Sequence, residues 1–216
     1  ASRMLDVCIE HDAVWRGGVD RVASVLGAFY EGAESAAMAG GRYCQMLRDD
    51  IAAKARLLRR PRYGLDDTLL GDVVEGLDDW IASNRTALVA RGPSVVDAHG
   101  DLRPEHICLE NPPVVIDCLD FDRGLRLLDP VSELAFLALE CERLGAEWIG
   151  RRVLKHYACR TDAGWPGGLV DFYQAYHCLV RAGVAVWHLE DHALDHTNRW
   201  MEKARRYLGM ARRLLQ

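Results

Sequence analysis

Residues 99–122 read HGDLRPEHICLENPPVVIDCLDFD, and this stretch decides which fold we expect for the chain. It places one carboxylate, Asp101, in a polar loop ahead of a short apolar run. Residues 111–113 (Asn-Pro-Pro) predict a turn, and the β-branched run at 114–116 predicts a strand that ends at a second carboxylate, Asp117. Because the hairpin is short, we expect it to return Asp117 to a place beside Asp101.

Outside this stretch the apolar residues recur at helical spacing. Asp129-Pro130 predicts a helix start, with Asp as N-cap and Pro at the first helical position. Helical patterns continue at about 146–159, 168–188 and 193–215. We therefore expect a mostly α (α+β) chain, one domain over 1–216, with a helical part (1–93), the loop and hairpin (94–122) and C-terminal helices (129–216).

Composition excludes several classes of protein. The net charge of -5 at pH 7 argues against general nucleic-acid binding, and the basic runs at 54–62 and 199–213 fall on amphipathic helical patterns. Seven scattered cysteines without a Cys-x-x-Cys pair indicate a reducing compartment, with no disulfide framework and no zinc ribbon. Neither a leader at Ala1 nor a membrane-length apolar run is visible. We expect a cytoplasmic chain that binds neither membrane nor nucleic acid.

The loop has the residue order of a phosphoryl-transfer site. His99 precedes Asp101, and His106 follows five residues after Asp101. Protein kinases carry a loop His, a catalytic Asp, a metal-binding Asn and then a second metal-binding Asp in this order. Phosphoryl transfer needs one acid to orient and deprotonate a hydroxyl, and another to hold the metal that bridges the nucleotide phosphates. Asp101 fits the first role and Asp117 the second.

Three linked segments, 99–106, 117–121 and 133–137, resemble the aminoglycoside phosphotransferase-like family of small-molecule kinases. The resemblance is specific over about 45 residues, and three segments in the right order make coincidence improbable. It implies the C-terminal lobe of the protein-kinase-like fold. It also implies ATP and Mg2+ as cofactors and a hydroxyl of a small molecule as phosphoryl acceptor.

The resemblance implies roles for single residues. Asp101 would be the catalytic acid-base group, and His99 would support the loop from beneath. Asp117 would bind the metal, with His106 and Asp120 as further candidate ligands. The acidic helix start at 129–135 would brace the loop.

Acceptor binding has two sets of candidates. Arg103 and Glu105 flank the acidic loop; Arg103 either contacts a phosphate or anionic substrate, or simply pairs with a neighbouring carboxylate such as Glu105. Tyr173, His177 and Arg181 lie on a later helical pattern and either line an acceptor pocket or pack in the core.

Two departures from the family pattern matter. His106 replaces the metal-binding Asn, although magnesium prefers oxygen ligands. Either one metal suffices, or His106 orients Asp101, or catalysis is lost. In addition, no Gly-rich loop or strand lysine precedes residue 99. We therefore expect an N-terminal nucleotide-binding lobe as a partner in the intact protein, and weak ATP binding by this lobe alone.

Two other functions stay open. A non-catalytic pseudokinase acting as a binding or scaffold module is favoured by His106 and by the missing lobe. A metal-dependent hydrolase would instead gather His99, Asp101, His106 and Asp117 around one metal. Separately, the histidines at 188, 192 and 196 have a spacing compatible with metal binding, but we favour the interpretation that they lie in a polar, exposed connector between two helices.

Overall fold

The computed structural model describes residues 3–161, 164–191 and 197–216. The chain folds as two compact units, each made of two stretches of sequence. Unit 1 comprises residues 1–38 and 93–170, and unit 2 comprises 39–92 and 171–216. The expectation of a mostly helical chain is confirmed. Its identity as a single kinase-like lobe stays a prediction.

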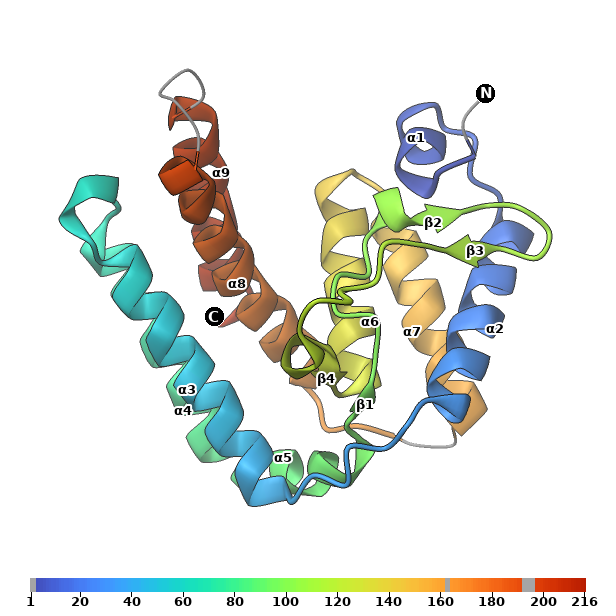
Figure 1. The fold of residues 1–216 in the computed structure, drawn as a ribbon, viewed down its shortest axis with the longest axis horizontal. Coiled ribbons are helices and arrows are strands. Elements are labelled where there is room, and N and C mark those ends of the chain that lie inside the picture. Colours follow the sequence, from blue (N-terminus) through green and yellow to red (C-terminus); the bar gives the residue numbers. More distant parts are fainter. Residues whose placement is uncertain (1–2, 162–163, 192–196) are drawn as a thin grey trace. The chain divides into compact units, whose positions relative to one another are not determined.

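Unit 1 holds all the described strands (Figure 1). Its elements in chain order are α1 (Leu5–Glu10), α2 (Arg16–Gly32), the 3-10 turn η2 (Gly92–Ser94), β1 (Val96–Asp97), η3 (Pro104–His106), β2 (Ile107–Cys108), β3 (Val114–Val115), η4 (Arg123–Arg126), β4 (Leu127–Leu128), α6 (Pro130–Arg143) and α7 (Glu147–Thr161).

The core of unit 1 lies where α7 packs against α2 and α6. One face of α2 is buried, with Val19, Val22, Leu26 and Tyr30 on it, and each fully buried aliphatic side chain contributes about 1.5–3 kcal/mol. Gly150 on α7 permits a close approach, because a Cβ there would lie 2.4 Å from Cα and Cβ of Ala138 on α6. The two helices therefore meet through a glycine that has no space for a side chain.

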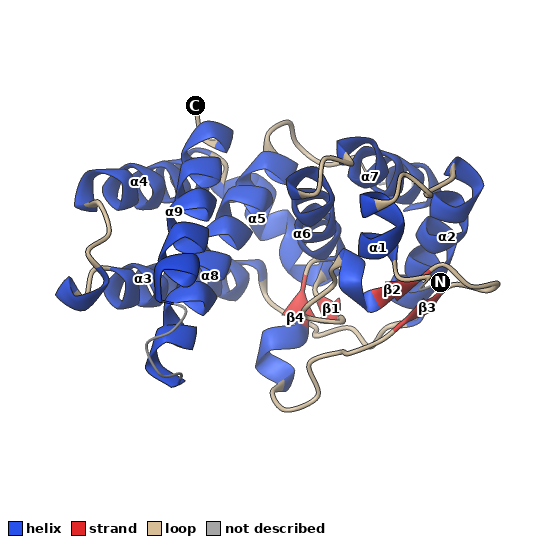
Figure 2. Ribbon diagram, turned by 90° about the horizontal axis from the view of Figure 1, so that it is seen from above, coloured by secondary structure: helices blue, strands red, loops and turns tan. Residues whose placement is uncertain are grey.

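Two short antiparallel strand pairs surround the predicted loop (Figure 2). The predicted hairpin is confirmed: β2 pairs with β3, with Ile107 opposite Val115. The loop precedes that hairpin, as predicted, and connects β1 to β2. β1 in turn pairs with β4 through Val96 and Leu128. A two-residue strand such as β4 is too short to show a sequence period, which is why it was not predicted.

The predicted helix start at Asp129-Pro130 is also confirmed. The Asp129 side chain accepts a hydrogen bond from the backbone N–H of Val131 at 3.0 Å, and Pro130 is the first residue of α6. Asp129 is completely buried, so the cap fixes α6 inside unit 1. The first turns of α6 thus have a defined position against the loop.

Unit 2 is helical throughout its described part. Its elements are α3 (Gly40–Leu58), the 3-10 turn η1 (Pro61–Tyr63), α4 (Asp67–Ser83), α5 (Arg85–Arg91), α8 (Leu169–Asp191), whose first two residues belong to unit 1, and α9 (Thr197–Leu214). α3 packs against α4 and α5, and α4 packs against α9. Of the three histidines with metal-like spacing, 192 and 196 lie outside the described residues.

Within the described ranges, the helices are too short or too polar to cross a lipid bilayer.

Candidate functional site

A buried carboxylate on α6 anchors the loop after β1. Oε1 of Glu133 accepts from the backbone N–H of Gly100 at 2.5 Å, and Oε2 accepts from the N–H of His99 at 3.2 Å. Oε2 also accepts from the hydroxyl of Tyr30 on α2 at 2.8 Å. The predicted brace from this helix start is therefore present. Gly100 has φ of +89°, a conformation that favours glycine, so the turn and its anchor fit one another.

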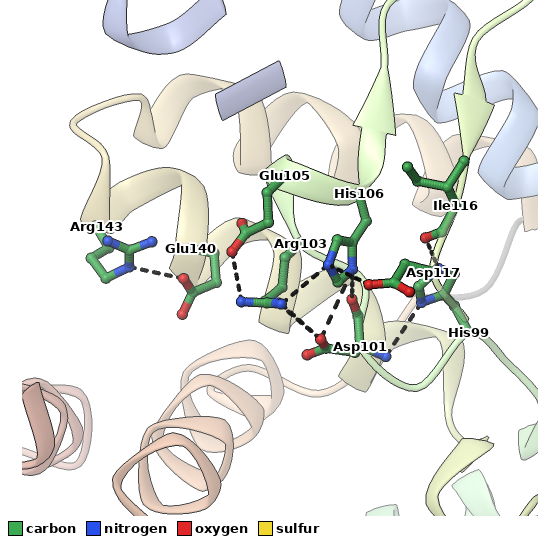
Figure 3. Close-up of polar contacts among 9 residues, drawn as sticks. All are labelled: His99, Asp101, Arg103, Glu105, His106, Ile116, Asp117, Glu140 and Arg143. Carbon is green, nitrogen blue, oxygen red and sulfur yellow. Dashed lines mark hydrogen bonds and ion pairs between the residues drawn. The ribbon is translucent and has the colours of Figure 1, made fainter. Parts of the chain in front are cut away.

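His99 lies beneath the loop and is 6% exposed. Its Nδ1 accepts from the backbone N–H of Asp101 at 3.3 Å, which places the ring proton on Nε2. Nε2 then donates to the carbonyl of Ile116 at 2.8 Å (Figure 3). The His99 ring thus connects the loop to the strand end that carries Asp117. This position beneath the loop agrees with a supporting role for His99.

The two predicted acids flank one imidazole ring (Figure 3). Nδ1 of His106 lies 3.9 Å from Oδ2 of Asp101, and Nε2 of the same ring lies 3.4 Å from Oδ2 of Asp117. The Asp117 side chain is 78% exposed and that of Asp101 is 20% exposed. The acids therefore converge on one ring, with Asp117 exposed to solvent and Asp101 partly buried.

The backbone of Asp117 is strained, since its φ is +64°. Left-handed residues other than glycine are uncommon, although Asp tolerates this region better than most. Such outliers cluster at functional sites, where the surrounding structure holds them in place. Here two hydrogen bonds fix Ile116, the residue before Asp117. Its carbonyl accepts from the His99 ring, and its N–H donates to the carbonyl of His106.

His106 is held by the main chain and by a neighbouring cation. Its Nδ1 lies 2.8 Å from the carbonyl oxygen of Asp101, so this nitrogen carries the proton and donates. Its Nε2 lies 3.1 Å from Nη2 of Arg103, which can only donate. Of the three options for His106, the one in which it positions Asp101 agrees with these contacts, although the bond reaches the Asp101 backbone.

Arg103 connects the acids of the loop. Its Nε and Nη2 both lie 3.0 Å from Oδ2 of Asp101, and its Nη1 lies 2.6 Å from Oε1 of Glu105. The expected ion pairing of Arg103 is therefore present. A contact of Arg103 or Glu105 with substrate stays a prediction. Figure 3 also draws a pair that the sequence did not suggest, in which Arg143 donates to the buried Glu140 at 2.8 Å.

Asp120 is exposed on the segment that follows Asp117. In the described part of the chain, no group of three or more His, Cys, Asp or Glu side chains is arranged to hold a metal ion. The candidate ligands Asp117, His106 and Asp120 thus do not make a preformed three-ligand centre. Nor do the four residues that the hydrolase alternative gathers, which are His99, Asp101, His106 and Asp117. A metal that arrives with a nucleotide needs fewer protein ligands.

A second ion-pair cluster, which the sequence did not indicate, clamps the segment after Asp117. Asp97 on β1 accepts from Nε of Arg126 at 2.7 Å and from Nε of Arg123 at 2.9 Å. The Arg126 hydrogen bond holds the pKa of Asp97 below its usual value. Arg126 also donates to the carbonyl of Leu119 at 2.6 Å. Both arginines lie more than 25 residues after Asp97, a separation at which sequence spacing does not reveal the pairing.

The remaining candidates, Tyr173, His177 and Arg181, lie on the part of α8 that belongs to unit 2, whereas the loop lies in unit 1. Tyr173 is completely buried, and its hydroxyl lies 2.9 Å from that of Tyr43. His177 is 6% exposed, and Arg181 is partly buried. Packing in the core agrees with the burial of Tyr173 and His177, and an acceptor-binding role for the three residues stays a prediction.

Comparison with known proteins gives relatives but no family. Uncharacterised proteins of Mycobacterium bovis and of two strains of Mycobacterium tuberculosis are 34% identical to the chain over 179 residues. The match covers 78% of this chain and 35% of each relative, so the chain spans only about a third of their length. No family model matches the sequence, and no solved structure matches the chain.

Proposed function

We propose that the chain is the C-terminal lobe of a small-molecule phosphotransferase that uses ATP and magnesium. The observation that carries the proposal is the convergence of Asp101 and Asp117 on the two nitrogens of His106. Two carboxylates a few ångströms from one ring, in the order and loop context of the kinase pattern, fit phosphoryl transfer to a hydroxyl. The likeness to the aminoglycoside phosphotransferase-like family supports the same conclusion.

We assign to Asp101 the role of binding and deprotonating the acceptor hydroxyl. Its carboxylate would orient an acceptor hydroxyl and take the proton as the new O–P bond forms. Arg103 donates twice to Oδ2 and so fixes the orientation of this carboxylate. Glu133 and His99 hold the loop backbone on either side of it. The chain would thus contribute mainly positioning and electrostatics, which dominate catalysis of this reaction.

Asp117 is the residue that fits magnesium. Its exposed carboxylate offers the hard oxygen donors that Mg2+ prefers, and it lies where a solvent-borne nucleotide could reach it. His106 fits poorly as a magnesium ligand, because both of its nitrogens have protein partners and imidazole is a soft donor for this ion. Magnesium-bound ATP would supply the transferable γ-phosphoryl group and neutralise part of its charge. An additional nucleotide-binding lobe is part of this proposal.

The second candidate is a non-catalytic binding module. The ion pair of Arg103 favours it, because it occupies Oδ2 of the Asp101 carboxylate. The replacement of Asn by His106 favours it as well.

Phosphate transfer from radiolabelled ATP to a panel of hydroxylated small molecules separates the two candidates. The measurement uses the full-length protein that carries this chain. We expect transfer by the wild-type protein and a loss of about 10²–10⁴-fold in Asp101→Asn. Glu110→Gln, on the exposed turn of the same hairpin, is the matched control and should retain full activity. Equal product from wild type and Asp101→Asn, or none from either, would favour the binding module.

A further inference from the structure

Tyr30 is buried on α2, 103 residues before its partner Glu133 on α6. It is 4% exposed, and its hydroxyl donates to Glu133 Oε2 at 2.8 Å. The same carboxylate holds the loop through the backbone N–H groups of His99 and Gly100. Tyr30 therefore touches no atom of the proposed reaction, but it contacts the group on which the loop is anchored.

Glu133 accepts from three hydrogen donors, namely the Tyr30 hydroxyl and the backbone N–H groups of His99 and Gly100, and these contacts favour its ionised carboxylate. A protonated carboxyl would carry a hydrogen of its own and would lose acceptor capacity toward one of these donors. Burial works in the opposite direction and raises the pKa of Glu133, while the hydrogen bond from Tyr30 is the largest influence that lowers it. The backbone bonds of Gly100 and His99 follow. The charge state of Glu133 thus depends on its donors.

Tyr30 itself remains a donor. Burial, and then the charge of Glu133, raise the pKa of the Tyr30 hydroxyl well above its usual value, so the hydroxyl keeps its proton. The other titratable groups around the pair are Tyr157, whose ring meets that of Tyr30 edge-on at 5.8 Å, together with Asp129, His99 and Cys118. The negative charge of Asp129 also raises the pKa of the Tyr30 hydroxyl, because it disfavours a second negative charge on Tyr30. Tyr30 therefore stays neutral and donates its hydroxyl hydrogen to Glu133.

We propose that Tyr30 is a positioning residue for the Asp101 loop: its hydroxyl keeps Glu133 in the ionised form that binds the backbone of His99 and Gly100. Through this bond, a residue of α2 sets the lower pH limit at which the loop is held in its working geometry. The inference rests on the proposed function only for its consequence in catalysis. The hydrogen-bond chain from Tyr30 through Glu133 to Gly100 can be tested without any substrate.

The experiment follows the backbone amide signal of Gly100 by two-dimensional 15N–1H NMR of the chain over a pH series. In the wild type this amide reports the titration of Glu133, and the ring signals of His99 are followed in parallel to separate its titration. We expect Tyr30→Phe to move the pH midpoint of the Gly100 amide titration upward by about one pH unit, since a hydrogen bond to a charged group is lost. Tyr43→Phe, which removes a buried hydroxyl pair in unit 2, is the control and should not move it.

An unchanged Gly100 midpoint in Tyr30→Phe would overturn the proposal, whatever the activity of the protein. Should Tyr30→Phe not fold, Glu133→Gln carries the test, because the Gly100 amide must then lose this titration altogether; persistence of the titration would overturn the proposal. In the phosphotransfer assay, the acidic limb of the pH profile of kcat should move upward with the NMR midpoint. A moved midpoint in a protein without phosphotransfer would retain the role of Tyr30 and reject the proposed function instead.

Discussion

Nε2 of His106 lies 3.4 Å from Oδ2 of Asp117, and the other nitrogen of the same ring donates to the backbone carbonyl of Asp101. The residue that departs most clearly from the kinase pattern is therefore the residue that joins the two acids. A ring held on both sides cannot also offer a lone pair to a metal. This geometry makes His106 a spacer between the acids, and under the proposed function Asp117 would be the residue that binds magnesium.

Replacing His106 by Asn should therefore change metal dependence. The shorter amide offers an oxygen to the ion and releases Asp117 from its imidazole neighbour, so we expect the half-saturating Mg2+ concentration in phosphotransfer to fall by about tenfold, as for other residues that support a metal ligand. The measurement is a magnesium titration of the initial rate at fixed ATP. An identical magnesium curve for wild type and His106→Asn would remove His106 from the site.

The clamp between Asp97 and Arg126 should make stability depend on pH in the acid range. The pKa of Asp97 is lowered by its Arg126 hydrogen bond, so its contribution is present above the unfolded-state pKa of about 3.9 and is lost as the pH falls through the folded-state pKa. Urea unfolding at pH 7, 4 and 3 should show a smaller decline for Asp97→Asn than for wild type. Parallel declines would show that the clamp adds no stability.

Glycine-to-alanine substitutions on two helices should change the free energy of unfolding in opposite directions. Gly150→Ala places a Cβ 2.4 Å from the Ala138 backbone on α6, so we expect a loss of about 1–3 kcal/mol in the free energy of unfolding. Gly71→Ala on α4 meets no atom within 4 Å and should stabilise by about 0.5–1 kcal/mol. Chemical denaturation of both variants checks the pair. A neutral Gly150→Ala would contradict the close α6–α7 contact.

Thiol labelling should separate Cys159 from Cys141. Cys159 is exposed on α7, whereas Cys141 is fully buried on α6 and burial strongly raises the pKa of its thiol. Since the thiolate is the reactive form, Cys159 should react with a maleimide in native buffer and Cys141 only after unfolding. Mass spectrometry of labelled peptides gives the order. Native labelling of Cys141 would mean that α6 is not packed as described.

The sequence predicts much of this site because its main parts are local. The hairpin from Ile107 to Val115 has strong turn and strand signals. Because the hairpin is short, Asp117 at its end must lie near the loop that precedes it. Asp129-Pro130 is a helix start that depends only on neighbouring residues.

The parts that could not be predicted are long-range pairs. The Tyr30 hydroxyl and Glu133 are far apart in sequence, and a tyrosine on a buried helical stripe is indistinguishable from one that only packs. Asp97 and its arginines pair across 26 to 29 residues in place of the acids nearer to them. The division into two units, each joining distant segments, likewise leaves no local signal.

Paramagnetic broadening by Mn2+ tests the convergence of the two acids most directly. Mn2+ replaces magnesium, and it is added with ATP at low occupancy to the 15N-labelled chain. The account predicts that the amide signals of Asp117 and Asp101 broaden first, that Asp117→Asn abolishes this broadening, and that Asp120→Asn shows whether Asp120 contributes a ligand. Broadening that is centred elsewhere, or that survives Asp117→Asn unchanged, would contradict the account.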